Sequence, residues 1–328
     1  MSRRCERARA GVYWELLRYV RVRVPSVGDE LGDRGVMNVT WEELSDRVLR
    51  CRLPVWDCTA GLVVGDDAVL MVDAGSSVGE GAQLRSEAER LLGRDRRVTH
   101  LALTHPHFDH VFGAAAFAGV EVYGAVGLGT ALHPEELRAD AVRNGLDPAE
   151  ASEAADLLVR PRHEVTGERT LDLGGLQVLL ANVGPGHSLH DVAVLVPTAP
   201  EIVFCGDLVE ESGEPQAGPD AVPSHWPAAL ERLLAFGGED AVYVPGHGAV
   251  VDAAFVRAQR DALADRFGVS ESGVSGTFRS VGARSGVSGH VPVCRGTFRC
   301  VESTFRCVAG AWPPVLLSSS ECASTRRI

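Results

Sequence analysis

Lysine is absent from this chain of 328 residues, and all 32 of its basic residues are arginine. We interpret this as a bias of genomic base composition rather than as a feature of mechanism. Long apolar runs are also absent, because no stretch approaches the ~18 residues that a membrane-spanning helix needs. Arg3 and Arg4 are followed by neither an apolar segment nor a small-residue cleavage site. We therefore expect no secretory signal, no membrane partner and a cytoplasmic location.

The eight cysteines lack the compact spacing of a disulfide framework. Without a secretory signal, reduced thiols are the expectation for such a set. An alternative is a metal or disulfide module near the C-terminus, built from Cys294, Cys300, Cys307 and Cys322. The spacing of these four matches no common zinc pattern. We favour a low-complexity Gly/Ser/Arg tail over residues 269–328, which we expect to be disordered.

Charge is distributed unevenly along the chain. Residues 37–268 carry 17 basic and 36 acidic residues, a net charge of −19, whereas 1–36 and 269–328 carry net charges of +3 and +4. An acidic body repels phosphate backbones, so we expect no nucleic-acid partner. We interpret 1–36 as a poorly ordered N-terminal extension that lies upstream of the native start of translation. The catalytic domain is then expected within 37–268.

Hydrophobic periodicity in that domain predicts alternating strands and helices. The predicted strands cover 62–64, 68–72, 98–103, 120–123, 170–173, 176–181, 192–196, 201–205 and 241–244. The predicted helices cover 80–92, 109–118, most of 131–159, 226–236 and 253–267. Asp109 is the expected N-cap of the second of these helices. Two similar halves, each a sheet with outer helices, indicate an α/β fold arranged as a four-layer αββα sandwich.

The strongest functional signal is the run Thr104-His105-Pro106-His107-Phe108-Asp109-His110, where a predicted strand ends and a helix begins. On extended backbone, side chains two residues apart project to the same side, so both His105 and His107 can face one pocket. Asp109 and His110 at the helix start can face it too. Imidazole and carboxylate ligands at this density suit zinc or iron.

Three further candidates each follow a predicted strand and a glycine: His187, Asp207 and His247. Glycine lets the backbone turn sharply and keeps space free around a metal ion. Together with the first run, these residues provide seven ligands, enough for two metal ions.

Taken together, these motifs resemble those of a known family. The pattern H-x-H-x-D-H, followed by Gly-His, Gly-Asp and Gly-His-Gly, resembles the metallo-β-lactamase-fold hydrolases over roughly residues 55–267. The resemblance implies that one metal ion is bound by His105, His107 and His187, that a second is bound by Asp109, His110 and His247, and that Asp207 bridges both. It also implies that Asp73 supports the ligands from outside. We expect His190 and His225 to contribute in the same way.

The ligand set implies a mechanism. Two ions, expected to be zinc with iron or manganese as alternatives, can hold a bridging water as hydroxide near neutral pH. That hydroxide is the nucleophile, and Asp109 can accept its proton as a catalytic base. The expected partner is a small-molecule substrate; no oligomeric state is predicted.

Differences between this sequence and known branches of the family narrow the set of reactions that we expect it to catalyse. Asp207 speaks against a true β-lactamase, because that branch typically lacks the bridging carboxylate. Glutathione-thioester hydrolases use basic residues near the C-terminus, for which only Arg257 and Arg260 are available. The residues after Asp207 lack the tyrosine of the quorum-sensing lactonases. We predict a dinuclear hydrolase of an ester, thioester, lactone or similar bond. A mononuclear iron enzyme like the sulfur dioxygenases and a non-catalytic metal-binding protein of the same fold are the alternatives.

Overall fold

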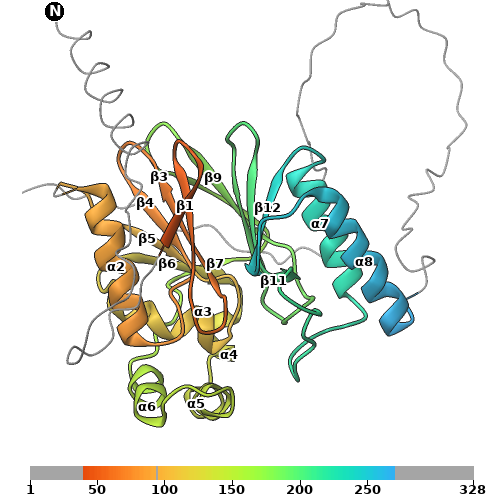
Figure 1. Ribbon diagram of the computed structural model, residues 1–328, viewed down its shortest axis with the longest axis horizontal. Coiled ribbons are helices and arrows are strands. Elements are labelled where there is room, and N and C mark those ends of the chain that lie inside the picture. The colour runs from red at the N-terminus through yellow and green to blue at the C-terminus, as the bar shows by residue number, and fades with distance from the viewer. Residues whose placement is uncertain (1–39, 94, 270–328) are drawn as a thin grey trace, which may run out of the picture. The chain divides into compact units, whose positions relative to one another are not determined.

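The computed structural model describes residues 40–93 and 95–269. Two β-sheets lie face to face between outer helices, so the predicted four-layer α/β sandwich is confirmed (Figure 1). The predicted N-terminal extension lies outside the described residues. So does the predicted tail beyond Val269, together with its four cysteines.

The first sheet has seven strands in sequence order. They are β1 (Thr40–Ser45), β2 (Val48–Arg52), β3 (Thr59–Val64), β4 (Val69–Val72), β5 (His100–Ala102), β6 (Glu121–Ala125) and β7 (His163–Val165). β1 to β4 pair antiparallel, and β4 to β7 pair parallel. The predicted hairpin is β3–β4, whereas β1, β2 and β7 were not predicted. Parallel pairing brings the carboxyl ends of β4 and β5 to one edge, where the predicted ligands begin.

The second sheet has the order β12-β11-β10-β9-β8. Its strands are β8 (Glu168–Asp172), β9 (Gln177–Asn182), β10 (Val192–Val196), β11 (Ile202–Glu210) and β12 (Val242–His247). β11 is longer than the predicted 201–205, and Asp207 lies inside it rather than after it. Gly206, at φ +54°, forms an irregularity in the β11–β12 pairing instead of ending the strand. All nine residues of the strand are buried, and its pairing with β12 extends to Glu210, opposite His247.

Helices cover the outer faces of both sheets (Figure 1). On the side of the first sheet lie α2 (Val78–Leu92) and the 3₁₀ helix η1 (Phe112–Phe117), and on the side of the second lie α7 (Trp226–Gly237) and α8 (Ala253–Phe267). The remaining helices are α3 (Phe108–Val111), α4 (Leu128–Ala131), α5 (Pro134–Arg143) and α6 (Pro148–Asp156). No helix in the described part of the chain is both long and apolar enough to cross a bilayer.

The helix predicted over 109–118 is wrong as a single element. It is split into α3 and η1, and its N-cap position is His107 rather than Asp109. The change of geometry coincides with close packing at Gly113, where a Cβ atom would lie 1.9 Å from the carbonyl oxygen of Ala74. This contact holds the segment against the end of β4 and against α2.

Two apolar cores hold the layers together. The larger fills the space between the sheets and extends under α2, and the smaller packs α7 and α8 on the second sheet. Trp226 and Tyr243 are fully buried in the smaller core. Burial of such side chains fixes the strands, so the loops at the strand ends are held on a rigid base.

Candidate metal centre

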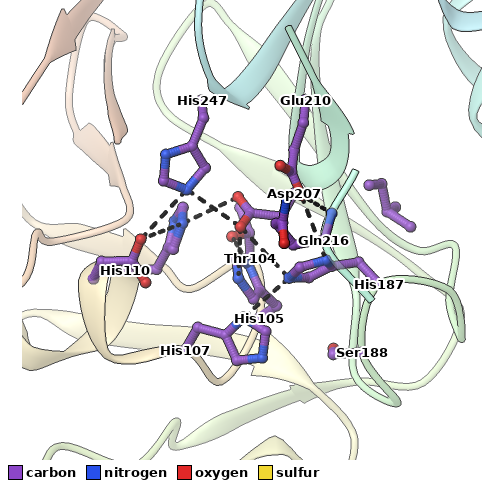
Figure 2. Close-up of polar contacts among 12 residues, drawn as sticks. Thr104, His105, His107, His110, His187, Ser188, Asp207, Glu210, Gln216 and His247 are labelled. Carbon is purple, nitrogen blue, oxygen red and sulfur yellow. Dashed lines mark hydrogen bonds and ion pairs between the residues drawn. The ribbon is translucent and has the colours of Figure 1, made fainter. Parts of the chain in front are cut away.

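The seven predicted ligands come together in one cluster, and all of them except Asp109 are labelled in Figure 2. One group, with ligand atoms within 4.8 Å of one another, comprises His105, His107, His187 and Asp207; a second comprises His110, Asp207 and His247. Asp207 belongs to both groups. Asp109 lies beside the second group and forms a third set with His110 and Cys58.

In the first group, two histidines converge on one carboxylate oxygen. His105 Nε2 and His187 Nε2 each lie 3.5 Å from Asp207 Oδ2. His107 Nδ1 lies 2.9 Å from His187 Nε2. All three rings therefore turn one nitrogen toward the same small volume.

The second group is arranged in the same way around Asp207. His110 Nε2 lies 3.1 Å from Asp207 Oδ1, and His247 Nε2 lies 3.3 Å from Asp207 Oδ2. His247 Nε2 is also 3.3 Å from Asp109 Oδ2. Asp207 thus presents its carboxylate to histidines of both groups.

Acceptors outside the cluster hold the opposite ring nitrogens of the histidines. His247 Nδ1 donates to the carbonyl oxygen of Trp56 at 2.7 Å, and His110 Nδ1 donates to Asp73 Oδ2 at 2.9 Å. His107 Nε2 donates to Asp220 at 3.1 Å. A ring nitrogen that donates its proton outward leaves the other nitrogen free to bind a metal ion.

His105 is held through a relay. The Thr104 hydroxyl donates to Asp73 Oδ2 at 2.8 Å and accepts from His105 Nδ1 at 2.9 Å. Asp73 also accepts from the Thr104 backbone N–H at 2.8 Å. The predicted supporting residue Asp73 therefore contacts His110 directly and His105 through Thr104.

Burial and neighbouring charges shift the pKa values of residues in the cluster. Burial lowers the pKa of His187 to about 4, which favours its neutral, metal-binding form. Burial opposes ionisation of Asp207, but His247, His110 and His105 outweigh it and hold the pKa of Asp207 well below its usual range. Asp207 is therefore an anion at neutral pH.

The residues fit a bound cation. His105 Nε2 is buried in the cluster without a hydrogen-bond partner, and Asp207 Oδ1 meets only His110 Nε2, at 3.1 Å. Buried polar atoms without partners are costly, and a cation between them removes that cost. The donors are imidazole nitrogens and carboxylate oxygens, which suit zinc.

Gly246 makes room for this arrangement. A Cβ atom on Gly246 would lie 1.8 Å from Asp207 Oδ1, closer than any side chain permits. The expectation that glycine keeps space free beside the ligands therefore has a direct structural basis at this position.

In the described part of the chain, no hydrogen bond or ring contact joins His190 or His225, both predicted to support the ligands, to a ligand side chain. The His190 ring bonds to the carbonyl oxygen of Val126 at 3.0 Å and not to His187. His225 is exposed at the start of α7, and among the described residues no hydrogen bond or ring contact joins it to the cluster. The next residue, Trp226, packs its ring against His187 at 5.3 Å between centroids. The supporting role of His225 therefore stays a prediction.

Sequence reasoning missed six residues that contact the ligands: Trp56, Cys58, Thr104, Glu210, Asp220 and Trp226. Thr104 directly precedes His105, so its hydroxyl was the one available signal. Trp56 acts through its backbone, and Asp220 reaches the site through tertiary structure alone. Glu210 lies on β11, three residues after Asp207. Glu210 Oε1 lies 3.9 Å from His187 Nδ1.

A pocket of about 760 Å³ opens over the cluster. Trp56 and Phe108, whose rings pack edge to face at 5.3 Å, form part of its wall. Within 131–159, which was predicted to be mostly helical, several residues between Ala131 and Asn144 contribute to the wall, whereas α6 does not line it. The volume suits a small molecule.

An αββα sandwich with a histidine and aspartate cluster at its strand ends defines a class of metal-binding proteins. The family model of the metallo-beta-lactamase superfamily matches residues 53–247, more than half of the chain. The chain belongs to this superfamily, which confirms the resemblance drawn from the motifs.

Two curated relatives carry the name metallo-beta-lactamase type 2. The Bacillus cereus protein is 26% identical over 161 residues, covering 48% of this chain and 54% of the relative. The Bacteroides fragilis protein is 30% identical over 90 residues, covering 27% of this chain and 36% of the relative. The chain thus spans about half, or less, of the length of these relatives.

Solved structures show the same fold. The metallo-beta-lactamase from Pontibacter korlensis is 22% identical with a TM-score of 0.53, covering 69% of this chain and 98% of that protein. The metallo-beta-lactamase FIM-1 from Pseudomonas aeruginosa, in its mono-zinc form, is also 22% identical with a TM-score of 0.53, covering 71% and 97%. At this identity the likeness concerns the fold alone.

Proposed function

We propose that the protein is a dinuclear, zinc-dependent hydrolase of an ester, thioester, lactone or similar small-molecule bond. The observation that carries the proposal is the position of Asp207 between two groups of histidines. Its Oδ2 atom lies within 3.5 Å of His105 Nε2 and His187 Nε2 on one side and 3.3 Å from His247 Nε2 on the other. A carboxylate so placed can be shared by two cations.

The proposed ligands divide into two sets that share Asp207. His105, His107 and His187 would hold one ion, and Asp109, His110 and His247 would hold the other, with Asp207 shared. When bound, the ions act as Lewis acids that lower the pKa of water and polarise the substrate carbonyl. Zinc is favoured by the histidine-rich donor set and by the zinc in the Pseudomonas aeruginosa structure.

Asp109 is the proposed proton acceptor. Burial raises the pKa of Asp109, but His110 and His247 outweigh this and lower it, so the carboxylate is ionised at neutral pH. Asp109 also lines the pocket, where it can take a proton from an attacking water. Trp56 and Phe108 line the same pocket.

Metal stoichiometry and a substrate panel together test the proposal. We expect about two zinc ions per chain by inductively coupled plasma mass spectrometry, and metal-dependent hydrolysis of at least one ester, thioester or lactone. A chelator should abolish turnover, and zinc should restore it. One iron per chain with oxygen uptake would instead identify a dioxygenase, and a chain that binds no metal after reconstitution would contradict the site.

Hydrolysis of β-lactams is the second candidate, because both curated relatives are named metallo-beta-lactamases. A chromogenic cephalosporin belongs in the same panel. Turnover of the cephalosporin well above that of every ester would favour this candidate over the first.

A further inference from the structure

One ligand histidine lacks the hydrogen bond that holds each of the others from outside the cluster. An outward-facing ring nitrogen is hydrogen-bonded in His105, His107, His110 and His247. In His187 the corresponding atom, Nδ1, is buried without a hydrogen-bond partner among the described residues. A buried polar atom without a partner is costly. The group that Nδ1 faces therefore decides whether His187 can be held as the other ligands are.

The side chain that faces this nitrogen is Glu210 (Figure 2). Glu210 Oε1 lies 3.9 Å from His187 Nδ1, and the two side chains are only 8% and 3% exposed. This separation is longer than a hydrogen bond. A small rotation of either side chain closes it, and no water competes for the contact where both groups are buried.

Glu210 is held in place from two directions. Its backbone N–H donates to Gln259 Oε1 at 3.1 Å, and its Oε1 accepts from the Gln216 backbone N–H at 3.0 Å. In the pairing of β11 with β12, Glu210 also lies opposite His247. The oxygen that faces His187 therefore belongs to a residue anchored in the second sheet.

Glu210 Oε1 is an acceptor whether or not the carboxyl group carries a proton. Burial, followed by the charge of Asp207, raises the pKa of Glu210 to about 7. Because the Gln216 N–H donates to Oε1, the proton of a neutral carboxyl group belongs on Oε2. Oε1 has two lone pairs, so it can accept from His187 in addition to Gln216.

The two tautomers of His187 differ in what they can bind. A neutral imidazole carries one proton. On Nε2, that proton can be donated to His107 Nδ1 at 2.9 Å, which blocks the nitrogen that faces the cluster. On Nδ1, it leaves Nε2 free for a metal ion but requires an acceptor on the opposite side of the ring. Glu210 Oε1 is an acceptor on that side.

We propose that Glu210 is a positioning residue, whose Oε1 accepts the Nδ1 proton of His187 and thereby stabilises the tautomer that binds metal through Nε2. This inference rests on the proposed function, in which His187 is a metal ligand. An acceptor of this kind fixes the orientation of a ligand ring and raises its basicity. Glu210 thus acts on the metal centre through His187 and is not itself a ligand.

Two substitutions of Glu210 in the full chain separate the acceptor from the charge. Glu210→Gln removes the charge but keeps an oxygen that can accept from both His187 and Gln216, whereas Glu210→Leu removes charge and acceptor. We expect Glu210→Leu to weaken zinc binding about 10- to 100-fold in competition with a chromogenic chelator, and Glu210→Gln to keep most of the affinity. Equal losses in the two variants, or unchanged binding in Glu210→Leu, would overturn the proposal.

The ring proton of His187 provides a readout that a purely structural role of Glu210 would not change. In the isotope-labelled, zinc-loaded chain, NMR should show the Nδ1–H signal downfield and in slow exchange with water. We expect this signal to move in Glu210→Gln, because an amide oxygen is a weaker acceptor than a carboxylate. Glu214→Gln is the matched control, since it removes an exposed carboxylate from the same pocket. An Nδ1–H signal that is the same in Glu210→Gln and in the unmodified chain refutes the contact.

Turnover distinguishes this proposal from the proposed function. If the chain binds zinc but hydrolyses no member of the panel, the proposed function fails, and the Nδ1–H signal still decides the role of Glu210. If a substrate is hydrolysed and the signal does not respond to Glu210→Gln, only the positioning role fails. A chain that binds no zinc after reconstitution contradicts both.

Discussion

The Asp73 carboxylate accepts a hydrogen bond from His110 Nδ1 at 2.9 Å, with both side chains almost completely buried. Asp73 follows β4 with a positive φ of 58°, a backbone conformation that few non-glycine residues adopt. It also binds Thr104 at the end of β5. One carboxylate therefore ties two strand ends together and orients histidines of both groups.

Asp73→Asn should weaken metal binding without removing a ligand. The amide cannot accept from His110 and Thr104 through both of its terminal atoms, so the ring orientation of His110 is lost. Loss of such a supporting hydrogen bond typically costs about 10- to 100-fold in metal affinity. Zinc competition with a chromogenic chelator measures it. Asp156→Asn, an exposed site on α6, is the matched control, and equal affinities in the two variants would contradict the role of Asp73.

Gly246→Ala should disrupt the cluster. The added methyl would lie 1.8 Å from Asp207 Oδ1, so either the carboxylate or the β12 backbone must move. We expect a loss of about 1–3 kcal/mol in the free energy of unfolding and a fall in bound zinc. Urea titration and metal analysis measure the two effects. Gly167→Ala, where a Cβ meets nothing within 4 Å, should change neither; unaltered metal content in Gly246→Ala would refute the packing argument.

Most of the metal ligands predicted from the sequence lie where an apolar run ends in a glycine or a histidine. The end of an apolar run can be recognised from neighbouring residues alone. The H-x-H-x-D-H run, His187 and His247 could therefore be found without a structure. Glycine misled once, at Gly206, where positive φ bends β11 without ending it. A glycine in the sequence does not show whether a strand ends there or continues with an irregularity. In β11 the residues after Gly206 are buried and remain in the strand.

Most of the residues that contact the ligands could not be predicted from the sequence. Asp220 contacts His107 across 113 positions in the chain, and Trp56 contacts His247 across 191. No periodicity links such positions. His190 was chosen for its closeness to His187 in sequence, but the loop turns its ring toward Val126. Closeness along the chain was therefore a poor guide to contact outside the strands, whereas β1 and β2 were missed because their alternation is weak.

Comparison of His107→Ala with His190→Ala should distinguish a metal ligand from a residue that lies beside the site without binding metal. His107 Nδ1 faces the cluster, so its removal should lower the metal content and abolish metal-dependent hydrolysis. His190 bonds to Val126 at the pocket wall, so its removal should leave the metal content unchanged. Mass spectrometry of the metal after gel filtration measures both. Full metal with retained turnover in His107→Ala would refute the site.

Asp191 should make stability depend on pH. It is 3% exposed, and burial raises the pKa of this carboxyl to about 7, against hydrogen bonds from the Ser188 N–H and hydroxyl that lower it. The folded chain therefore binds this proton more tightly than the unfolded chain, whose aspartates titrate near pH ~4. The contribution of Asp191 to stability is fully present below that pH and is lost as the pH rises through about 7.

Asp191→Asn removes the titration and keeps the shape of the side chain. We expect the variant to gain stability relative to the unmodified chain as the pH rises from ~4 to ~7, by up to about 1.4 kcal/mol per pH unit. Urea titrations of both metal-free proteins across this range measure the difference, so the titration of the metal ligands, common to both, cancels. Parallel curves would mean that the Ser188 hydrogen bonds keep Asp191 ionised and outweigh its burial.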